Sequence, residues 1–196
     1  MKHIGITGGM GSGKSIVCQL FALQGVPVFN ADAEAKQLYT TDAELAEWVR
    51  HRFGNETYIN QQFQPKVLAA KVFGNPEALA ELNAQVHPRI RTRAAQWRAR
   101  QQTPYTLTEA ALMMESGSYT DYNAVILVES ALELRLQRIM QRDGSTEAAA
   151  MQRIQAQWSD EQRRPLATHI IHNNEQEALI PQVLELHGLW WPPVNE

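Results

Sequence analysis

The chain has 196 residues, of which 44% are hydrophobic and 20% are charged, and its formal net charge is −3. This length suits one well-buried core with a small appended subdomain. The slight acidity argues against a nucleic-acid partner, since such proteins usually carry a basic domain. No apolar run approaches the roughly 18 residues of a membrane span, and no signal peptide precedes the first predicted strand. We therefore expect a cytoplasmic globular protein that binds neither nucleic acid nor membrane.

The N-terminal segment is predicted to form a strand over residues 2–7, a glycine-rich loop and an apolar helix. The loop Gly8-Gly9-Met10-Gly11-Ser12-Gly13-Lys14-Ser15 fits G-x-x-x-x-G-K-[ST], the pattern of the phosphate-binding P-loop. The order of strand, loop and helix separates a functional P-loop from a chance match. The alternative is a glycine-rich turn without a ligand. The pattern favours a nucleotide site.

The residue types of this loop suit a triphosphate. The glycines let successive backbone N–H groups turn inward as an anion-binding nest, with no Cβ to block phosphate oxygens. The free N–H groups and the dipole at the start of the helix also favour negative charge. Lys14 is expected to reach the β- and γ-phosphates, and the Ser15 hydroxyl is expected to bind Mg²⁺. The predicted nucleotide contacts are Gly9, Gly11, Ser12, Gly13, Lys14, Ser15 and Ile16.

Further along the chain, a second strand at residues 26–29 is followed by a long stretch with helical spacing of apolar residues. Such an insertion exceeds what a simple crossover requires. We predict a helical subdomain over residues 33–102 and a P-loop core over residues 1–32 and 103–196. In the insertion, helical spacing is clearest at residues 43–53, 66–73 and 76–86.

The second half of the core shows strands alternating with helices, which indicates a parallel sheet covered on both faces. The predicted class is therefore α/β. Cys18, the single cysteine, is expected to be a buried small hydrophobe. Strands are predicted at residues 105–114, 124–128 and 169–172, and helices at residues 133–142, 147–158 and 179–186.

Asp32 follows the second strand, at the edge of the sheet where open α/β proteins bind ligands. A carboxylate there could accept the proton of an attacking hydroxyl during phosphoryl transfer. It could equally be the N-cap of a helix that starts near Ala33. The pattern alone leaves both interpretations open.

Three arginines, Arg135, Arg138 and Arg142, recur at i, i+3 and i+7 of a predicted helix, and Arg153 follows in the next helix. The residues between the helices resemble the tip of a lid, which we predict over about residues 140–155. Lid arginines can stabilise charge on a transferring phosphoryl group. A solvated helix face is the alternative.

No acidic residue lies between Glu81 and Glu109. This basic stretch is expected either to receive an anionic acceptor or to form the exposed face of a long helix. Its arginines are Arg89, Arg91, Arg93, Arg98 and Arg100.

Two patterns near the C-terminus have unremarkable interpretations. His169 and His172 form a weak metal pair, because residues three apart in a strand face opposite sides. The segment Leu189-Trp190-Trp191-Pro192-Pro193 is expected to cover the apolar core.

Several segments together are similar to one family. Leu82-Asn83-Ala84-Gln85-Val86-His87-Pro88-Arg89-Ile90 contains an Asn-x-x-x-His-Pro stretch that few other P-loop proteins share. With the strand and loop of residues 5–15 and the ending Asn30-Ala31-Asp32, it resembles the dephospho-coenzyme A kinases. The resemblance spans residues 4–174 and continues in residues 112–116, 137–143, 153–157 and 170–174.

The resemblance implies ATP- and Mg²⁺-dependent phosphorylation of the ribose 3′-hydroxyl of dephospho-CoA, the last step of coenzyme A biosynthesis. It makes Asp32 the general base, with Lys14 and Arg142 as further catalytic residues. It assigns Arg142 and Arg153 to a lid over ATP and places Asn174 near the adenine. The residues expected to bind the acceptor are Asp32, Lys66, His87, Arg91 and Glu115.

The chain departs from the family pattern at a few positions. Asn30 replaces an Asp, Lys66 stands near a usual Arg, Ala111 stands where Pro is common, and Thr168 replaces an Asp. None of these positions is in the P-loop or is Asp32, so we expect an active enzyme. The acceptor contact of Lys66 stays open.

Two other functions remain open at this point. One is another small-molecule P-loop kinase, acting on a nucleotide or nucleoside. The other is a nucleotide-binding regulatory module, which would need a guanine-reading Asn-Lys-x-Asp motif that the sequence lacks. The expected partners are ATP and dephospho-CoA, and the expected state is a monomer, with a weak oligomer left open.

Overall fold

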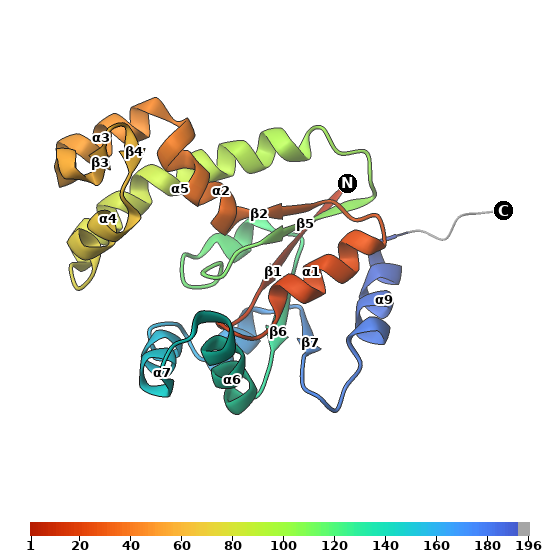
Figure 1. Ribbon diagram of the computed structural model, residues 1–196. Coiled ribbons are helices and arrows are strands. Elements are labelled where there is room, and N and C mark those ends of the chain that lie inside the picture. The colour runs from red at the N-terminus through yellow and green to blue at the C-terminus, as the bar shows by residue number, and fades with distance from the viewer. Residues whose placement is uncertain (192–196) are drawn as a thin grey trace. The chain divides into compact units, whose positions relative to one another are not determined.

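The computed structural model describes residues 1–191 and confirms the α/β class (Figure 1). The chain divides into two compact units. The core unit consists of Met1–Asn30 and Gln101–Glu196, and the helical unit consists of Ala31–Arg100. Pro192 and Pro193, which the sequence analysis assigned to an apolar cover, lie outside the described residues.

The core unit is built on a parallel five-stranded sheet with the order β2-β5-β1-β6-β7. β1 is central, so the loop that follows it leaves the sheet between β5 and β6. In register, Glu109 of β5 lies beside Ile6 of β1 and Asn30 of β2. The strands are β1 (Lys2–Thr7), β2 (Val28–Asn30), β5 (Tyr105–Glu109), β6 (Ala124–Glu129) and β7 (His169–His172).

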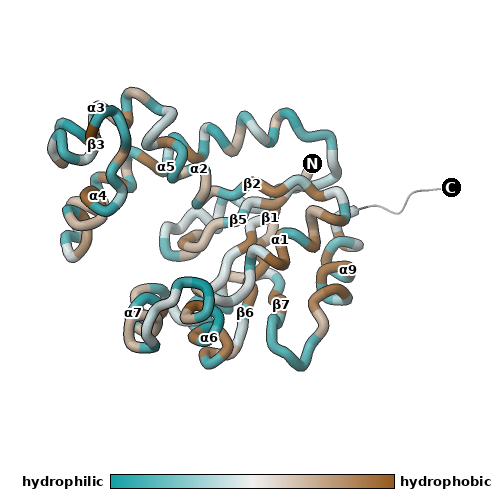
Figure 2. Tube along the Cα trace, viewed as in Figure 1, coloured by the Kyte–Doolittle hydropathy of each residue, from teal (hydrophilic) through white to brown (hydrophobic). Residues whose placement is uncertain are grey.

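The two faces of this sheet have different covers. On one face, side chains such as Ile6 pack against α1 (Lys14–Leu23) and α9 (Leu179–Trp190), where apolar residues concentrate (Figure 2). Cys18 of α1 is buried here as predicted, and burial raises the pKa of its thiol well above the usual range. Trp190 packs against Tyr105, with ring centroids 5.4 Å apart, so this part of the predicted C-terminal cover is confirmed.

The opposite face is covered by a segment that the sequence analysis assigned differently. The predicted strand 105–114 ends at Glu109, and residues 111–117 form turns instead. Met113 and Met114 are buried as expected of a strand, but they pack beside Val125. The apolar residues that follow Glu109 in the sequence therefore gave no sign that the strand ends there. A short 3-10 helix, η2 (Ser118–Asp121), follows.

The predicted lid is a helical hairpin of α6 (Leu132–Asp143) and α7 (Glu147–Gln155). Gly144, with φ 62°, ends α6, and the Thr146 side chain caps α7 by accepting from Ala149 N–H. The predicted extension of α7 to residue 158 is wrong, because Ser159 starts a new helix with a capping box. That helix is α8 (Asp160–Arg163), and the 3-10 helix η3 (Arg164–Leu166) leads into β7.

The helical unit has its own core, formed by residues such as Leu45 and Val49. Asp42 and Asn75 cap two of its helices through side-chain oxygens. A short hairpin, not predicted, turns at Asn60 and Gln61, which both have positive φ. The elements are α2 (Ala31–Thr41), α3 (Ala43–Phe53), η1 (Asn55–Thr57), β3 (Tyr58–Ile59), β4 (Gln62–Phe63), α4 (Pro65–Val72) and α5 (Pro76–Arg98).

Across residues 1–191, none of the helices has the length and apolar character that a membrane crossing needs.

Leu107 tests the burial of the core sheet. The side chain is 0% exposed, so Leu107→Ala should lower the free energy of unfolding by about 2–5 kcal/mol. Leu23→Ala, at a side chain that is 79% exposed, is the control and should change it by about 0.5 kcal/mol or less. Chemical denaturation of both variants measures the difference. Equal effects would contradict the assigned core.

Candidate active site

The P-loop of residues 8–15 joins β1 to α1 within the core unit. Gly11 and Gly13 have φ values of 78° and 91°, a region that residues with a Cβ rarely adopt. Gly13 is the N-cap of α1 and brings no side-chain acceptor to the first N–H groups of the helix. A helix start without a side-chain cap suits an anion, and phosphate binding at this loop stays a prediction of the sequence pattern.

The glycines serve a second purpose that the sequence analysis missed. A Cβ on Gly9 would collide with the guanidinium of Arg135, and a Cβ on Gly13 would collide with the side-chain amide of Asn173. A Cβ on Gly11 would lie 2.7 Å from the carbonyl oxygen of Arg135. The small residues thus admit α6 and the end of β7 against the outside of the loop, besides admitting phosphate on the inside.

Lys14 folds back over the loop. Its Nζ donates to the carbonyl of Gly8 at 2.7 Å and to that of Gly9 at 3.3 Å. These hydrogen bonds hold the ammonium group of Lys14 at the loop, where the phosphates of ATP are predicted to bind.

Ser15 lies beside a buried carboxylate. Ser15 Oγ donates to Glu109 Oε1 at 3.1 Å, and Asn30 Nδ2 donates to Glu109 Oε2 at 2.8 Å. Glu109 is only 6% exposed at the end of β5. A hydroxyl and a carboxylate are the hard oxygen ligands that Mg²⁺ prefers, and P-loop enzymes pair the loop hydroxyl with an acidic residue in this way. The residues present therefore fit a magnesium ion.

The sequence analysis did not identify Glu109, because it placed this residue inside a strand that was predicted to continue to residue 114. The available signal was the single carboxylate after the alternating residues 105–108. Its position beside Ser15 depends on the pairing of β5 with β1, which the sequence does not show.

Among residues 1–191, no three His, Cys, Asp or Glu side chains are grouped so that they could hold a metal by themselves. A magnesium ion at Ser15 would thus take most of its ligands from phosphate and water. His169 and His172, the weak metal pair of the sequence analysis, have different neighbours. His169 packs on Trp190, and His172 lies beside Glu129.

Asp32 lies in the first turn of α2, which begins at Ala31. The alternative interpretation as the N-cap of a helix starting near Ala33 is therefore wrong. A carboxylate in the first turn still stabilises the helix through its dipole. Along the chain, Asp32 is two residues beyond Asn30, the partner of Glu109.

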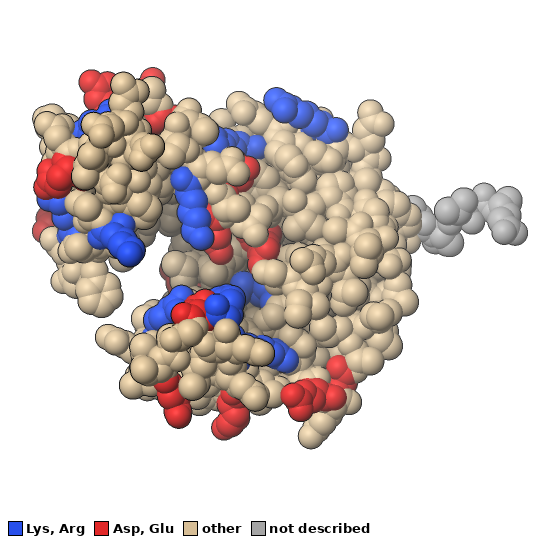
Figure 3. Space-filling model, in the orientation of Figure 1, with Lys and Arg blue, Asp and Glu red and all other residues tan. Residues whose placement is uncertain are grey.

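The predicted lid arginines are brought together at the end of α6. Arg142 donates to both oxygens of Asp143, at 2.7 and 3.0 Å, and Arg153 donates to one of them at 2.6 Å. Hydrogen bonds from Arg142 and then from Arg153 hold the pKa of the Asp143 carboxyl well below its usual range. Basic side chains lie beside acidic ones over this hairpin (Figure 3).

Arg135 and Arg138 do not join this group. Arg135 Nε donates to Met10 O at 2.9 Å, and Arg138 donates to Gly11 O at 3.3 Å. They hold the backbone of the P-loop, which the spacing of the arginines on one helix did not indicate.

The two asparagines after β7 differ in their contacts. Asn173 Nδ2 donates to Ser12 O at 2.7 Å, and Asn174 Oδ1 accepts from Ala131 N–H at 2.9 Å. The contact of Asn174 with adenine stays a prediction.

The residues predicted to bind the acceptor are divided between the two units. Lys66 lies in the first turn of α4, and His87 and Arg91 lie one turn apart on α5. Burial, and then the charge of Arg91, lower the pKa of His87 below its ordinary value. Glu115 belongs to the core unit and accepts from the fully buried Arg163 at 2.6 Å. Their contacts with an acceptor stay predictions.

Two arginines of the basic stretch are neutralised within the helical unit. Arg89 pairs with Asp42 at 3.1 Å, and Arg93 pairs with Glu34 at 3.2 Å. These pairs support α5 against α2 and α3.

Comparison with known proteins gives consistent matches. A family model described as dephospho-CoA kinase matches residues 2–178. A dephospho-CoA kinase from Bacteroides fragilis is 35% identical over 193 residues, which are 98% of this chain and 94% of that protein. Among solved structures, TT1252 from Thermus thermophilus has a TM-score of 0.85 at 32% identity, over 94% of this chain and 95% of that chain. Dephospho-CoA kinase from Campylobacter jejuni has a TM-score of 0.67 at 26% identity, over 94% of each chain.

Glu109 can be tested through the metal. Glu109→Gln should weaken the binding of Mn²⁺ to the protein saturated with a nonhydrolysable ATP analogue by about 10-fold or more, because it removes a carboxylate beside the ion. Electron paramagnetic resonance counts the free Mn²⁺. Glu129→Gln is the control, since Glu129 is buried at the end of β6 and pairs with Arg164. Equal Mn²⁺ affinity in the two variants would remove Glu109 from the metal site.

Proposed function

This chain belongs to the dephospho-CoA kinase family, and we propose that it transfers the γ-phosphate of ATP to the ribose 3′-hydroxyl of dephospho-CoA, giving CoA and ADP. The observation that carries the proposal is the P-loop whose Ser15 is hydrogen-bonded to the buried Glu109, in a chain that the family model matches over residues 2–178. A loop for the triphosphate and an acidic residue for the metal are the two parts that phosphoryl transfer requires.

In the proposed reaction, the 3′-oxygen of the acceptor forms a bond with the γ-phosphorus while the bond to the β-phosphate oxygen breaks. Asp32 takes the proton of the hydroxyl. Lys14 and the N–H groups of the loop bind the phosphates and balance the charge that moves toward ADP. Ser15 and Glu109 are the residues that would hold Mg²⁺, which would supply positive charge to the phosphates of ATP.

The lid arginines complete this proposal. Arg142 and Arg153 now share Asp143, and guanidinium groups bind carboxylate and phosphate with the same fork of donors. We expect Arg142 and Arg153 to bind the phosphates of ATP and to give up their hydrogen bonds with Asp143 when they do so. Closure of such a lid would exclude water, which otherwise competes with the acceptor hydroxyl.

The proposal names only small molecules, ATP and dephospho-CoA, as partners. We expect the enzyme to act in the cytoplasm as a monomer. Light scattering coupled to size-exclusion chromatography measures the mass of the particle directly.

The activity is tested by incubating the purified protein with ATP and Mg²⁺, with and without dephospho-CoA, and measuring ADP and CoA by mass. We expect one CoA for each ADP. Lys14→Ala should lower kcat by about 10²–10³-fold, because it removes a cation from the transferring phosphate. Lys71→Ala is the control, since Lys71 pairs with Glu56 at the surface of the helical unit. ADP release that does not respond to dephospho-CoA would reject the proposed acceptor in favour of another nucleoside or nucleotide, or of water.

The general base is tested by Asp32→Asn, which keeps the shape of the side chain and removes its basicity. At saturating substrates kcat should fall by about 10²–10⁴-fold, the usual contribution of a general base. Glu34→Gln, also in the first turn of α2, is the matched control and should retain most of the turnover. Near-normal turnover by the Asp32 variant would mean that another group accepts the proton.

A further inference from the structure

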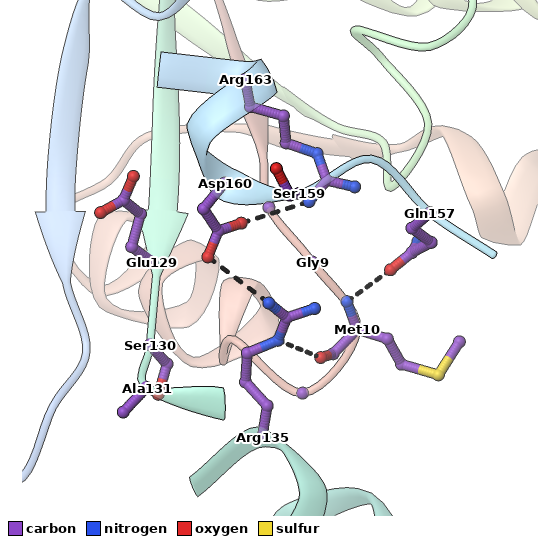
Figure 4. Close-up of polar contacts among 12 residues, drawn as sticks. Gly9, Met10, Glu129, Ser130, Ala131, Arg135, Gln157, Ser159, Asp160 and Arg163 are labelled. Carbon is purple, nitrogen blue, oxygen red and sulfur yellow. Dashed lines mark hydrogen bonds and ion pairs between the residues drawn. The ribbon is translucent and has the colours of Figure 1, made fainter. Parts of the chain in front are cut away.

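The backbone of Met10 is held at both its N–H and its carbonyl by side chains that flank the lid. Met10 N–H donates to Gln157 Oε1 at 2.7 Å, and Met10 O accepts from Arg135 Nε at 2.9 Å (Figure 4). Arg135 lies on α6, and Gln157 follows the end of α7. The side chain of Met10 packs on the apolar cluster between these two helices, which includes Ile139 and Ile154. Met10 is therefore the point at which the P-loop is joined to the base of the lid.

Arg135 is itself fixed by a buried network of charges. Its NH1 pairs with Asp160 Oδ2 at 3.4 Å, and the other oxygen of Asp160 accepts from Arg163 at 3.2 Å. Arg163, which is 0% exposed, also donates a hydrogen bond to Glu115 at 2.6 Å. Glu115 also accepts from the backbone N–H of Trp158 at 3.3 Å. Two cations and two carboxylates thus alternate from the P-loop to the turn after β5.

The network leaves one buried donor of Arg135 over the loop. Within the described part of the chain, its second amino group has no hydrogen-bond partner, and it lies where a Cβ of Gly9 would be. Burial lowers the pKa of Arg135 below its ordinary value, and Asp160 opposes this. Burying a charged group with an unpartnered N–H costs free energy, which the contacts of Arg135 with Met10 and Asp160 must offset.

The two neighbouring carbonyls are held in the same manner. Gly11 O accepts from Arg138 at 3.3 Å, and Ser12 O accepts from Asn173 Nδ2 at 2.7 Å. Three consecutive carbonyls of the loop therefore accept side-chain N–H groups from outside. A fixed carbonyl also fixes the N–H of the next residue, because both belong to one planar peptide group. Gly11 N–H and Gly13 N–H are thereby set by the Met10 and Ser12 carbonyls for an anion-binding nest, whereas Ser12 N–H donates to Gly9 O at 3.1 Å.

We propose that Arg135 and Gln157 are positioning residues of the phosphate site: they hold the two peptide groups that flank Met10 so that the P-loop is already shaped for the triphosphate, and Asp160, Arg163 and Glu115 keep Arg135 in place. The proposal rests on the proposed function in that ATP is the ligand of the loop. A loop with four glycines in six residues is flexible when it is free. Fixing it before ATP arrives removes part of the ordering that binding otherwise requires.

The proposal is tested by the affinity for Mg²⁺-ATP, measured by isothermal titration calorimetry without dephospho-CoA. Gln157→Met removes the acceptor of Met10 N–H and should weaken ATP binding about 5- to 10-fold. Arg135→Met should weaken it about 10-fold or more, because it removes a charged donor. Arg164→Met is the control. Arg164 lies next to Arg163 but pairs with Glu129 instead, so its replacement should leave the ATP affinity unchanged.

A double-mutant cycle tests the path from Asp160. The proposal assigns Asp160 to the loop through Arg135, so the variant with both Asp160→Asn and Arg135→Met should bind ATP as weakly as Arg135→Met alone. If the two losses instead multiply, Asp160 does not act through Arg135 and the network is overturned. Unchanged ATP affinity in both Arg135→Met and Gln157→Met would overturn the positioning role itself.

Steady-state kinetics separates positioning from general destabilisation. Loss of folded enzyme would lower kcat and leave both KM values unchanged. Loss of a shaped loop should raise the KM for ATP and leave the KM for dephospho-CoA unchanged. Gln157→Met breaks a single hydrogen bond and should remain folded by circular dichroism even if Arg135→Met does not. If the wild-type protein binds ATP but forms no CoA, the proposed function fails, while the ATP affinities of the variants still decide this proposal.

Discussion

The close approach of α6 to the backbone of the P-loop is the contact on which the nucleotide site depends. It is possible only because Gly9 and Gly11 have no Cβ at the points where Arg135 reaches the loop. Gly11 also has a positive φ of 78°, which a residue with a Cβ rarely adopts, and glycines without a Cβ leave room for phosphate oxygens at the loop. One choice of residue thus serves the ligand on the inside of the loop and the lid on the outside. A larger side chain at either position would separate the lid helices from the loop.

The sequence predicted the features that depend on neighbouring residues, but it did not predict those that depend on the pairing of strands distant in the chain. The P-loop motif, the strand before it and the α/β class follow from neighbouring residues, and the structure and the comparisons confirm them. Glu109 was missed because its role arises from the register of β5 beside β1. The buried apolar residues Met113 and Met114 extended the predicted strand too far, because burial in a turn and burial in a strand look alike in sequence.

The arginines show the same limit more sharply. Arg135, Arg138 and Arg142 repeat at helical spacing, so the sequence treated them as one group. In the folded chain Arg142 joins Arg153 at Asp143, whereas Arg135 and Arg138 hold carbonyls of the P-loop. Helical periodicity shows which face of the helix a residue lies on, but it does not show how deeply that residue is buried. Along α6 the burial changes, because the helix runs from the buried base of the hairpin to its exposed end. The Asn-x-x-x-His-Pro stretch, by contrast, carried the family although none of its contacts could be derived from spacing.

This change of depth along α6 agrees with the proposed lid, whose tip would close over ATP while its base stays fixed. At the base, Arg135, Asp160 and Arg163 are between 0% and 12% exposed, and removing one partner from such a network costs about 3–5 kcal/mol. At the tip, Arg142 and Arg153 are 61% and 45% exposed, although three hydrogen bonds join them to Asp143. A phosphate could replace Asp143 there without leaving a buried charge unpaired, whereas releasing Met10 from Arg135 would leave buried polar groups without partners. The hairpin thus combines a buried attachment to the P-loop with an exposed tip, and these are the two properties that the proposed lid over a triphosphate requires.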